Sequence, residues 1–358
     1  MPSFEVRIPG VTRSYRVAVE RGLIDRAGPE IQALSPGPVA VVTDENVARL
    51  HLGRLRASLP EPPRVEVVLP PGERTKSLER AAEVVDSLVD AGLDRGTVLV
   101  ALGGGVVGDL AGFAASLYLR GIRWVMVPTT LLAQVDSSVG GKVGVNLPRG
   151  KNLLGAFHQP SLVLADPAAL ETLPDRELAA GMAEVVKTAL IGSRLLFERL
   201  QAEIGRLLSP GGAAGAAEVV LECCQIKARV VEADERESGL RRILNFGHTL
   251  GHAIEAATGF SAFRHGEAVA LGMRAALVLS RDRGGLPPGD FVRALELVHR
   301  IPVPDFPIPR DRDLLAEMIR RDKKVEAGTV QAVVLEGIGR AKTVQVPVEA
   351  IVEGMLSL

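Results

Sequence analysis

The sequence is poor in cysteine, aromatic residues, lysine and asparagine, and it carries almost no net charge. Its 358 residues include 42 Lys or Arg and 43 Asp or Glu, so it has no excess of basic charge to hold nucleic acid or an anionic membrane surface. Hydrophobic residues make up 47% of the chain, which allows a large core and excludes a protein that is disordered throughout. The length is typical of two domains.

The two cysteines, Cys223 and Cys224, are adjacent in an apolar helical pattern. They cannot join distant segments and they lack the spacing of metal ligands, so we expect inert thiols in a cytoplasmic protein. The stretch 96–119 contains no Lys or Arg, but its three consecutive glycines and Asp109 favour a strand, a turn and a helix over a membrane span. No basic segment followed by an apolar run opens the chain, so no secretory signal is expected.

Lysine is rare even among the basic residues, since only eight of the 42 are Lys. A compact ammonium group can contact a single phosphate oxygen or change its protonation state, which a planar guanidinium cannot do. The lysines are therefore candidate functional residues, against the alternative that their positions reflect drift. They are Lys76, Lys142, Lys151, Lys187, Lys227, Lys323, Lys324 and Lys342. Asparagine is rarer still, at Asn46, Asn146, Asn152 and Asn245.

The pattern of apolar runs changes near residue 175. Before it, short β-rich runs at 4–8, 15–19, 38–43, 64–69, 97–102, 123–127 and 161–165 alternate with helical patterns at 22–34, 45–58, 77–91 and 106–119. This alternation predicts an α/β domain over 1–174 with a Rossmann-like, doubly wound parallel sheet. After it, helical patterns cover 176–192, 194–208, 213–233, 240–257, 265–283 and 289–300, with one β-like run at 329–335. We predict an all-α, helical domain over 175–358.

A glycine-rich loop follows the expected strand at 97–102. Gly103 to Asp109 fit the pattern G-x-G-x-x-G at the start of a helix, where backbone N–H groups can hold a pyrophosphate. The acidic residue that usually follows about twenty positions later is missing, but Asp44 ends an earlier strand and could accept a ribose hydroxyl. A nucleotide would then lie across two neighbouring strand ends. The alternative is a tight turn without a ligand.

Three of the six histidines, His248, His252 and His265, fall within 18 residues. His248 and His252 are four residues apart and would share a helix face. Glu184 and Lys187 share a face of another predicted helix. Two imidazoles and one carboxylate are a common ligand set for Zn²⁺, which predicts a catalytic metal centre. Alternatively, the histidines only pack or cap a helix, and Glu184 pairs with Lys187.

The motifs together, in this order, resemble the 3-dehydroquinate synthase family of sugar-phosphate cyclases. The resemblance covers nearly the whole chain and rests on an ordered set of short segments. They are 71–77, 103–109, 128–130, Asp136 with 140–142, 151–152, 184–187, 237–245, His252, 265–267 and 322–324.

The resemblance implies that NAD and a divalent metal, Zn²⁺ or Co²⁺, are bound. The implied NAD-binding residues are Asp44, Asn46, Glu73, Lys76, Gly104, Gly105, Val106, Asp109, Thr129, Thr130, Lys142, Lys151 and Thr172, the last in the segment 169–172. The implied metal ligands are Glu184, His248 and His265, so that His252 handles protons instead of binding the metal. The implied catalytic residues are Lys142, His252, Glu237, Asn245, Arg241, Lys187 and Asp136.

The implied substrate is 3-deoxy-D-arabino-heptulosonate 7-phosphate, which the family converts to 3-dehydroquinate and phosphate in the shikimate pathway. The route is transient oxidation by NAD, β-elimination of phosphate, re-reduction, ring opening and aldol closure. The implied substrate ligands are Arg120, Asn152, Lys227 and Lys324, or Lys323 in place of Lys324. Arg120 would come from a neighbouring subunit, which implies a homodimer. Three alternatives remain open: a cyclase such as 2-deoxy-scyllo-inosose synthase, a glycerol-phosphate type dehydrogenase, and a regulatory protein that binds a nucleotide without catalysis.

Overall fold

The structure is a computed structural model that describes residues 1–8, 14–209, 211–259, 262–306, 311–320, 325–326 and 329–357. The chain forms two compact units. The first comprises Met1–Leu173 and Gly211–Glu232, and the second comprises Pro174–Pro210 and Ala233–Leu358. Within the described residues, no helix combines the length and the apolar character that crossing a bilayer requires.

The first unit is built on a seven-stranded sheet with the order β1-β2-β9-β6-β5-β3-β4. All pairs are parallel except β1 with β2. The strands are β1 (Ser3–Val6), β2 (Tyr15–Val19), β3 (Val39–Asp44), β4 (Val65–Leu69), β5 (Val98–Gly103), β6 (Arg123–Pro128) and β9 (Leu162–Ala165). Each lies within two residues of the boundaries predicted from the sequence. The central strands are continuous apolar runs because helices cover both of their faces, and every residue of β5 is buried.

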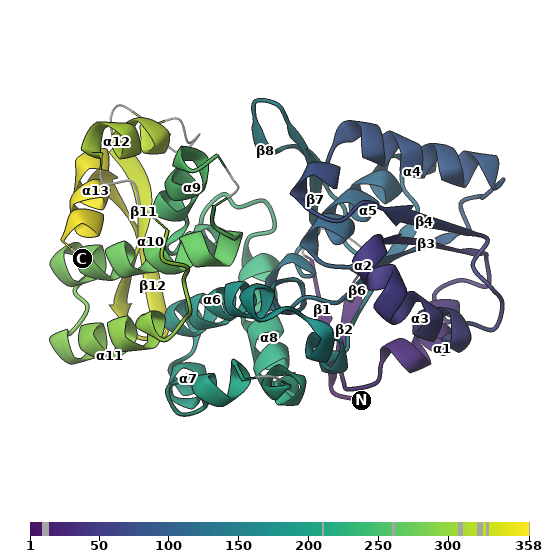
Figure 1. Cartoon of the computed structure of the whole chain (residues 1–358), viewed down its shortest axis with the longest axis horizontal. Helices are drawn as coiled ribbons and strands as arrows, with labels where there is room; N and C mark the ends of the chain where they lie inside the picture. The colour runs from purple at the N-terminus through teal and green to yellow at the C-terminus, as the bar shows by residue number, and fades with distance from the viewer. Residues whose placement is uncertain are drawn as a thin grey trace. The chain divides into compact units, whose positions relative to one another are not determined.

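Helices pack on both faces of this sheet. Figure 1 shows α4 (Leu78–Asp90) and α5 (Gly105–Leu117) on one side of it, and α1 (Ala27–Gln32), α2 (Glu45–Val47) and α3 (Gly53–Ser58) on the other. Side chains of α1 and α3, such as Ile31 and Leu55, form one core with Val100 and Leu102 of β5. The fold is the predicted doubly wound α/β arrangement.

Two features of the first unit differ from the sequence prediction. An antiparallel hairpin of β7 (Lys142–Leu147) and β8 (Gly150–Phe157) was not predicted, because β8 lacks a continuous apolar run and its residues are exposed or half-buried. The helix α8 (Ala217–Ala233) was placed in the second domain, but residues 211–232 group with the first unit. The physical reason is three anchors: the Cys224 thiol donates to the Gln134 carbonyl, Lys227 donates to Asp136, and the Arg7 backbone N–H donates to Glu232.

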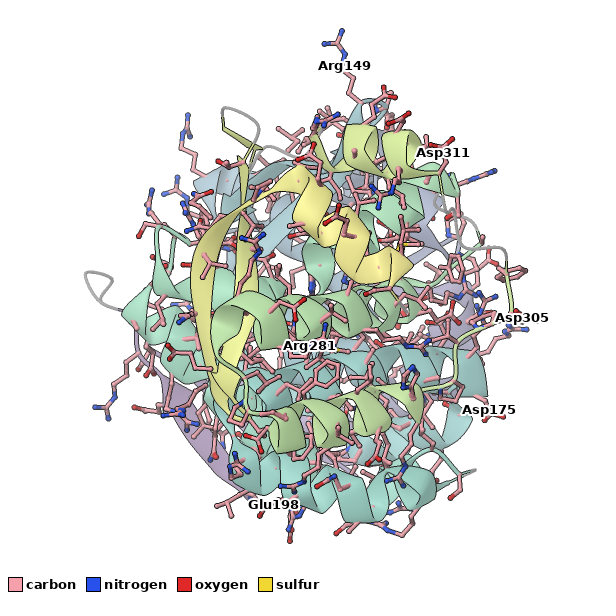
Figure 2. All side chains as sticks on the ribbon, turned by 90° about the vertical axis from the view of Figure 1, so that its left-hand side faces the viewer. Arg149, Asp175, Glu198, Arg281, Asp305 and Asp311 are labelled. Atoms are coloured by element: carbon pink, nitrogen blue, oxygen red, sulfur yellow. The ribbon has the colours of Figure 1, made fainter. Side chains whose placement is uncertain are left out.

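The second unit is mainly helical. Its α-helices are α6 (Asp175–Gly192), α7 (Arg194–Leu207), α9 (His248–Ala257), α10 (His265–Leu279), α11 (Pro288–His299), α12 (Arg312–Arg320) and α13 (Val348–Leu356). They enclose a core that includes Leu250, Leu271, Leu315 and Val334. Charged side chains such as Asp175, Glu198 and Asp311 project outward from this unit (Figure 2).

This unit also contains a three-stranded antiparallel sheet of β10 (Val325–Glu326), β11 (Thr329–Gly337) and β12 (Arg340–Pro347). Only β11 was predicted, because half of the residues of β12 are charged or polar and only one of its eight residues is buried. The predicted continuous helix over 240–257 is interrupted. A 3-10 helix, η8 (Leu240–Asn245), ends before Gly247, whose left-handed φ of 79° starts α9 in a new direction.

Candidate active-site residues and family membership

The carboxyl ends of β3, β5 and β6 meet at one edge of the first unit's sheet. Thr43 is paired with Leu102, and Gly103 with Pro128, so Asp44, Gly103 and the Thr129–Thr130 pair lie at the same level on neighbouring strands. The chain reverses its direction of winding between β3 and β5, since β4 lies on one side of β3 and β5 on the other. Ligands of doubly wound sheets bind at this topological switch point. This explains why the glycine loop follows a middle strand.

The glycine loop is packed closely against the side chains of Thr130 and Ser137. A Cβ at Gly104 would lie 2.9 Å from Thr130 Cγ2, and one at Gly105 would lie 3.2 Å from Ser137 Oγ. Helix α5 begins at Gly105, so its first N–H groups emerge here. The hydroxyls of Thr129 and Ser137 are buried and make no hydrogen bond within the described part of the chain. Donors and acceptors of this kind suit a pyrophosphate, and no sequence pattern pointed to Ser137.

A network beside α5 joins four predicted cofactor- and substrate-binding residues and Asn146, which was not predicted as a ligand. Lys76 Nζ donates to Asp109 Oδ2 and to Asn152 Oδ1, both at 2.5 Å. The Asn152 backbone N–H donates to Asn146 Oδ1 at 2.9 Å, and Asn146 Nδ2 donates to Glu73 Oε1 at 2.7 Å. Burial raises the pKa of Asp109, and the Lys76 ammonium opposes this shift. The network brings together residues between 73 and 152 that sequence spacing could not connect.

Asp136 and Lys227 form a second charged pair. Lys227 Nζ donates to the Asp136 carbonyl at 2.6 Å and to its carboxylate. One helical turn earlier on α8, burial raises the pKa of the Cys224 thiol to about 12. The thiol is therefore protonated at neutral pH, as expected for an inert cysteine.

The remaining predicted residues of the first unit occupy other positions around the sheet. Asp44 caps α2 by accepting the backbone N–H groups of Asn46 and Val47 at 2.9 and 3.0 Å. The Thr172 hydroxyl donates to the Ala169 carbonyl at 2.9 Å. Other predicted positions, exposed or half-buried, are Val106 in the first turn of α5, Arg120 after α5, Lys142 at the start of β7 and Lys151 in β8.

In the second unit, α6, α9 and α10 bring four predicted side chains together. The rings of His248, His252 and His265 lie with their centroids 5.2 to 5.7 Å apart. One ligand atom from each of these rings lies within 4.8 Å of those of the others. Glu184 Oε1 lies 3.8 Å from His248 Nε2 and 3.6 Å from His265 Nε2. Glu184 also pairs with Lys187, so the expected ion pair and the histidine cluster occur together.

The hydrogen bonds of two rings leave their Nε2 atoms facing Glu184. His248 Nδ1 lies 3.2 Å from the Phe246 carbonyl, which can only accept, so Nδ1 carries the proton. Burial, followed by the charge of Lys187, lowers the pKa of His248 well below its usual range, so the ring is neutral. Burial alone would lower the pKa of His265, but its hydrogen bond to Glu255 raises it. Two Nε2 atoms converging on one carboxylate fit a divalent cation.

A tight loop before α9 holds three more predicted residues. Asp234 accepts hydrogen bonds from the backbone N–H groups of Ser238, Gly239 and Arg241 at 2.9, 2.7 and 3.0 Å. Inside this loop Glu237 has a left-handed φ of 60°. Its carboxylate accepts from Asn245 Nδ2 at 2.6 Å. The predicted residues Lys323 and Lys324 lie outside the described residues.

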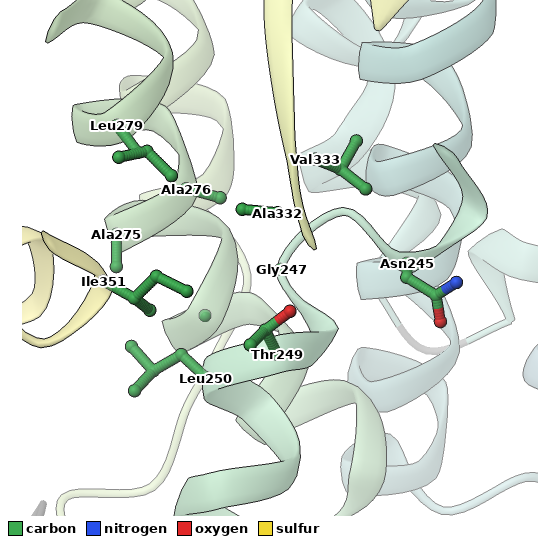
Figure 3. A pocket seen from close by; sticks show the side chains of 11 residues that line it. Asn245, Gly247, Thr249, Leu250, Ala275, Ala276, Leu279, Ala332, Val333 and Ile351 are labelled. Carbon is green, nitrogen blue, oxygen red and sulfur yellow. The ribbon is translucent and has the colours of Figure 1, made fainter. Parts of the chain in front are cut away.

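A pocket in the second unit lies beside this loop. Figure 3 shows the aliphatic side chains of Leu250, Leu279 and Ile351 on one side and Asn245 on the other. None of the three histidines lines it. The lining is mostly apolar and contains no cationic side chain, which the predicted phosphate-binding site requires.

Comparison with known proteins agrees with these features. The family model described as 3-dehydroquinate synthase N-terminal matches residues 66–180, and the one described as 3-dehydroquinate synthase C-terminal matches residues 181–325. A curated 3-dehydroquinate synthase of Rhodospirillum rubrum is 51% identical over 340 residues, which cover 92% of this chain and 88% of that protein. The chain belongs to the 3-dehydroquinate synthase family.

Solved structures of related cyclases share the fold of this 3-dehydroquinate synthase family member. A 2-deoxy-scyllo-inosose synthase complexed with carbaglucose-6-phosphate, NAD⁺ and Co²⁺ is 26% identical, with a TM-score of 0.86 and coverage of 99% of both chains. A 2-epi-5-epi-valiolone synthase from Streptomyces hygroscopicus with NAD⁺ and Zn²⁺ bound is 32% identical, with a TM-score of 0.84 and coverage of 98% of both chains.

Proposed function

We propose that this protein converts 3-deoxy-D-arabino-heptulosonate 7-phosphate to 3-dehydroquinate and phosphate, with NAD and a divalent metal, Zn²⁺ or Co²⁺. The observation that carries the catalytic proposal is the convergence of His248 Nε2 and His265 Nε2 on Glu184. Family membership at about half identity to curated synthases supports this substrate over that of the more distant inosose synthase.

The metal would be held by Glu184, His248 and His265, with His252 beside it. When bound, the ion would polarise a substrate hydroxyl and lower its pKa. The neutral His248 ring supplies a lone pair for the ion without first losing a proton. His252 is the most exposed of the three rings, which suits a group that exchanges protons with substrate or solvent.

The dinucleotide would lie at the switch point of the first unit. When bound, NAD would take up and return a hydride, so the overall reaction involves no net redox change. Gly104 and Gly105 let the pyrophosphate approach the start of α5, and Asp44 and Lys76 lie on elements beside it. The unbonded hydroxyls of Thr129 and Ser137 would accept or donate hydrogen bonds to the phosphates.

Cationic side chains would hold the substrate phosphate and stabilise it as it leaves. The proposed substrate ligands in the first unit are Lys142, Asn152 and Lys227, and those in the second are Lys187, Arg241, Asn245 and one of Lys323 and Lys324. Glu237 would orient Asn245 through their hydrogen bond. Asp136 would orient Lys227 in the same way, through its carboxylate.

We also infer a homodimer in which Arg120 reaches the substrate of the partner subunit. Leu119 and Arg120 have left-handed φ values of 49° and 65°, which present Arg120 at the surface beside the exposed Leu117 and Leu119. Mixing Arg120→Ala with Lys142→Ala subunits tests this. After subunit exchange the mixture would recover about a quarter of the wild-type rate, because about half of the dimers are hybrids and each hybrid has one intact site out of two. No recovery after subunit exchange would contradict the shared site. The buried thiols of Cys223 and Cys224, which form no disulfide among the described residues, support a cytoplasmic location, which fractionation of cells would test.

The direct test of activity compares heptulosonate phosphate with glucose 6-phosphate as substrates of the NAD- and Co²⁺-loaded protein. Release of phosphate from the first substrate only is the expected result, and turnover of glucose 6-phosphate alone would refute the proposed substrate. Lys142→Ala and His252→Ala should each abolish turnover while the thermal unfolding midpoint is retained. Lys342→Ala is the matched control, because this lysine is exposed and pairs with Glu336, and it should keep the full rate.

A further inference from the structure

A buried carboxylate, Glu255, lies behind the histidine cluster. It is only 2% exposed and sits on α9, seven residues and about two turns after His248. Its Oε2 lies 3.1 Å from His265 Nδ1. None of the motifs that predict the site from the sequence includes Glu255, although its spacing places it on the same face of α9 as His248 and His252.

The contact with Glu255 determines which nitrogen of His265 carries the proton. An ionised carboxylate only accepts hydrogen bonds, so His265 Nδ1 must be the donor. The other nitrogen, Nε2, then has a free lone pair when the ring is neutral. It faces Glu184 Oε1 at 3.6 Å. His248 is arranged in the same way, with the Phe246 carbonyl in the role of Glu255.

Charge balance points in the same direction. Burying a carboxylate is costly unless positive charge compensates it. Around the histidines the structure places two buried carboxylates, Glu184 and Glu255, and one buried ammonium group, Lys187. A divalent cation facing the three rings would add positive charge beside these two carboxylates.

We propose that Glu255 is a positioning residue that fixes the tautomer and orientation of His265 for a divalent cation. The inference rests on the proposed metal site at Glu184, His248 and His265 and adds a carboxylate behind one ligand. Histidine ligands commonly donate their second N–H to such a partner, and loss of the partner weakens metal binding about 10- to 100-fold. The competing explanation is that Glu255 only stabilises the packing of α9 against α10.

Two substitutions separate these explanations. Glu255→Gln keeps the shape of the side chain but removes its charge. The amide oxygen can still accept from Nδ1, whereas the amide nitrogen would donate to Nδ1, place the proton of His265 on Nε2 and block the lone pair. Glu255→Ala removes the partner altogether. Asp290→Asn is the matched control, because Asp290 is a partly buried carboxylate of the same unit that pairs with Arg194 at 2.6 Å.

The experiment strips the full-length protein of metal, titrates it with Co²⁺ against a competing chelator, and follows the visible absorption of bound Co²⁺. Unfolding of each metal-free protein is measured alongside. We expect the affinity for Co²⁺ to fall about 10-fold in Glu255→Gln and up to about 100-fold in Glu255→Ala, with no change in Asp290→Asn. The Co²⁺ spectrum of Glu255→Gln should also change, because His265 would bind the metal without its carboxylate partner.

The outcomes distinguish this inference from the proposed function. If the wild-type protein binds Co²⁺ and both Glu255 variants bind it with the wild-type affinity and spectrum, Glu255 has no positioning role and the metal site stands. The positioning role is equally refuted if the variants lose only stability. If the wild-type protein binds no Co²⁺, the proposed metal site is wrong and the role of Glu255 falls with it.

Discussion

Replacing Lys76 with methionine should destabilise the first unit through a single buried ion pair. The Lys76 side chain is 6% exposed and its partner Asp109 is 22% exposed, with Nζ and Oδ2 2.5 Å apart. Removing one partner of a fully buried pair costs about 3–5 kcal/mol. Because Asp109 keeps some contact with water, we expect a loss of roughly 2–4 kcal/mol in the free energy of unfolding.

The chain offers a convenient assay for this loss. Its only tryptophan is Trp124, which is buried in β6 of the first unit, so its fluorescence during urea denaturation reports the unfolding of this unit. Each kcal/mol corresponds to about 2–4 °C in Tm for a unit of this size. Lys342→Met is the control, since its ion pair with Glu336 is exposed and worth at most about 1 kcal/mol.

The effect should depend on pH in a defined direction. Burial already raises the pKa of Asp109, and removing the opposing Lys76 ammonium raises it further. A carboxyl group whose pKa is higher in the folded state stabilises the fold below its unfolded pKa and loses that contribution as the pH rises through the folded pKa. The deficit of Lys76→Met should therefore grow from acidic to neutral pH.

A double variant provides the decisive comparison. Lys76→Met with Asp109→Asn leaves no buried charge, so it should be more stable than the sum of the two single effects predicts. A strictly additive double variant, or a deficit that does not change with pH, would refute the proposed coupling.

Three further predictions concern stability and reactivity. Cys224 should resist iodoacetamide in the folded protein at neutral pH and react in denaturant, because burial raises its pKa to about 12; labelling of the folded protein would contradict this. Burial tends to raise the pKa of Asp234, but hydrogen bonds from Ser238, Gly239 and Arg241 outweigh it and lower the pKa. Asp234→Asn should therefore be less stable than the wild type at neutral pH, and this difference should vanish as acid protonates the wild-type carboxylate. A difference in stability that persists in strong acid would count against the loop geometry. Gly272→Ala should lower the free energy of unfolding by about 1–3 kcal/mol in urea denaturation, because its Cβ would collide with a backbone carbonyl at the start of α9. Gly289→Ala is the control, since it has open space around it and should not destabilise the protein. Equal stabilities of the two variants would refute the close helix contact.

Local patterns predicted most of the fold of the first unit. The buried strands are continuous apolar runs, and their boundaries follow from the chain alone. The β7–β8 hairpin was missed because its strands carry neither a long apolar run nor a clean alternation. Helix α8 was assigned to the wrong unit because its anchors, among them the bond from Cys224 to Gln134, join residues about 90 positions apart.

For the site, too, features that are local in the sequence were predicted and contacts between distant residues were not. The clustering of His248, His252 and His265 was visible in the sequence because the three residues are close in the chain. The hydrogen bonds that set the protonated nitrogen of two of these rings are donated to the Phe246 carbonyl and to Glu255, and finding them required the three-dimensional structure. The same holds for the link from Lys76 to Asn152, which no spacing rule predicts.

The most direct test of the proposed function is a single turnover with enzyme in excess of 3-deoxy-D-arabino-heptulosonate 7-phosphate, in the presence of NAD and Co²⁺. Released phosphate and the near-ultraviolet absorbance of reduced nicotinamide are followed together. A cyclase of the proposed kind releases one phosphate per substrate while the absorbance returns to its starting value. One reduced cofactor accumulating per substrate, without phosphate release, would show a simple dehydrogenase instead.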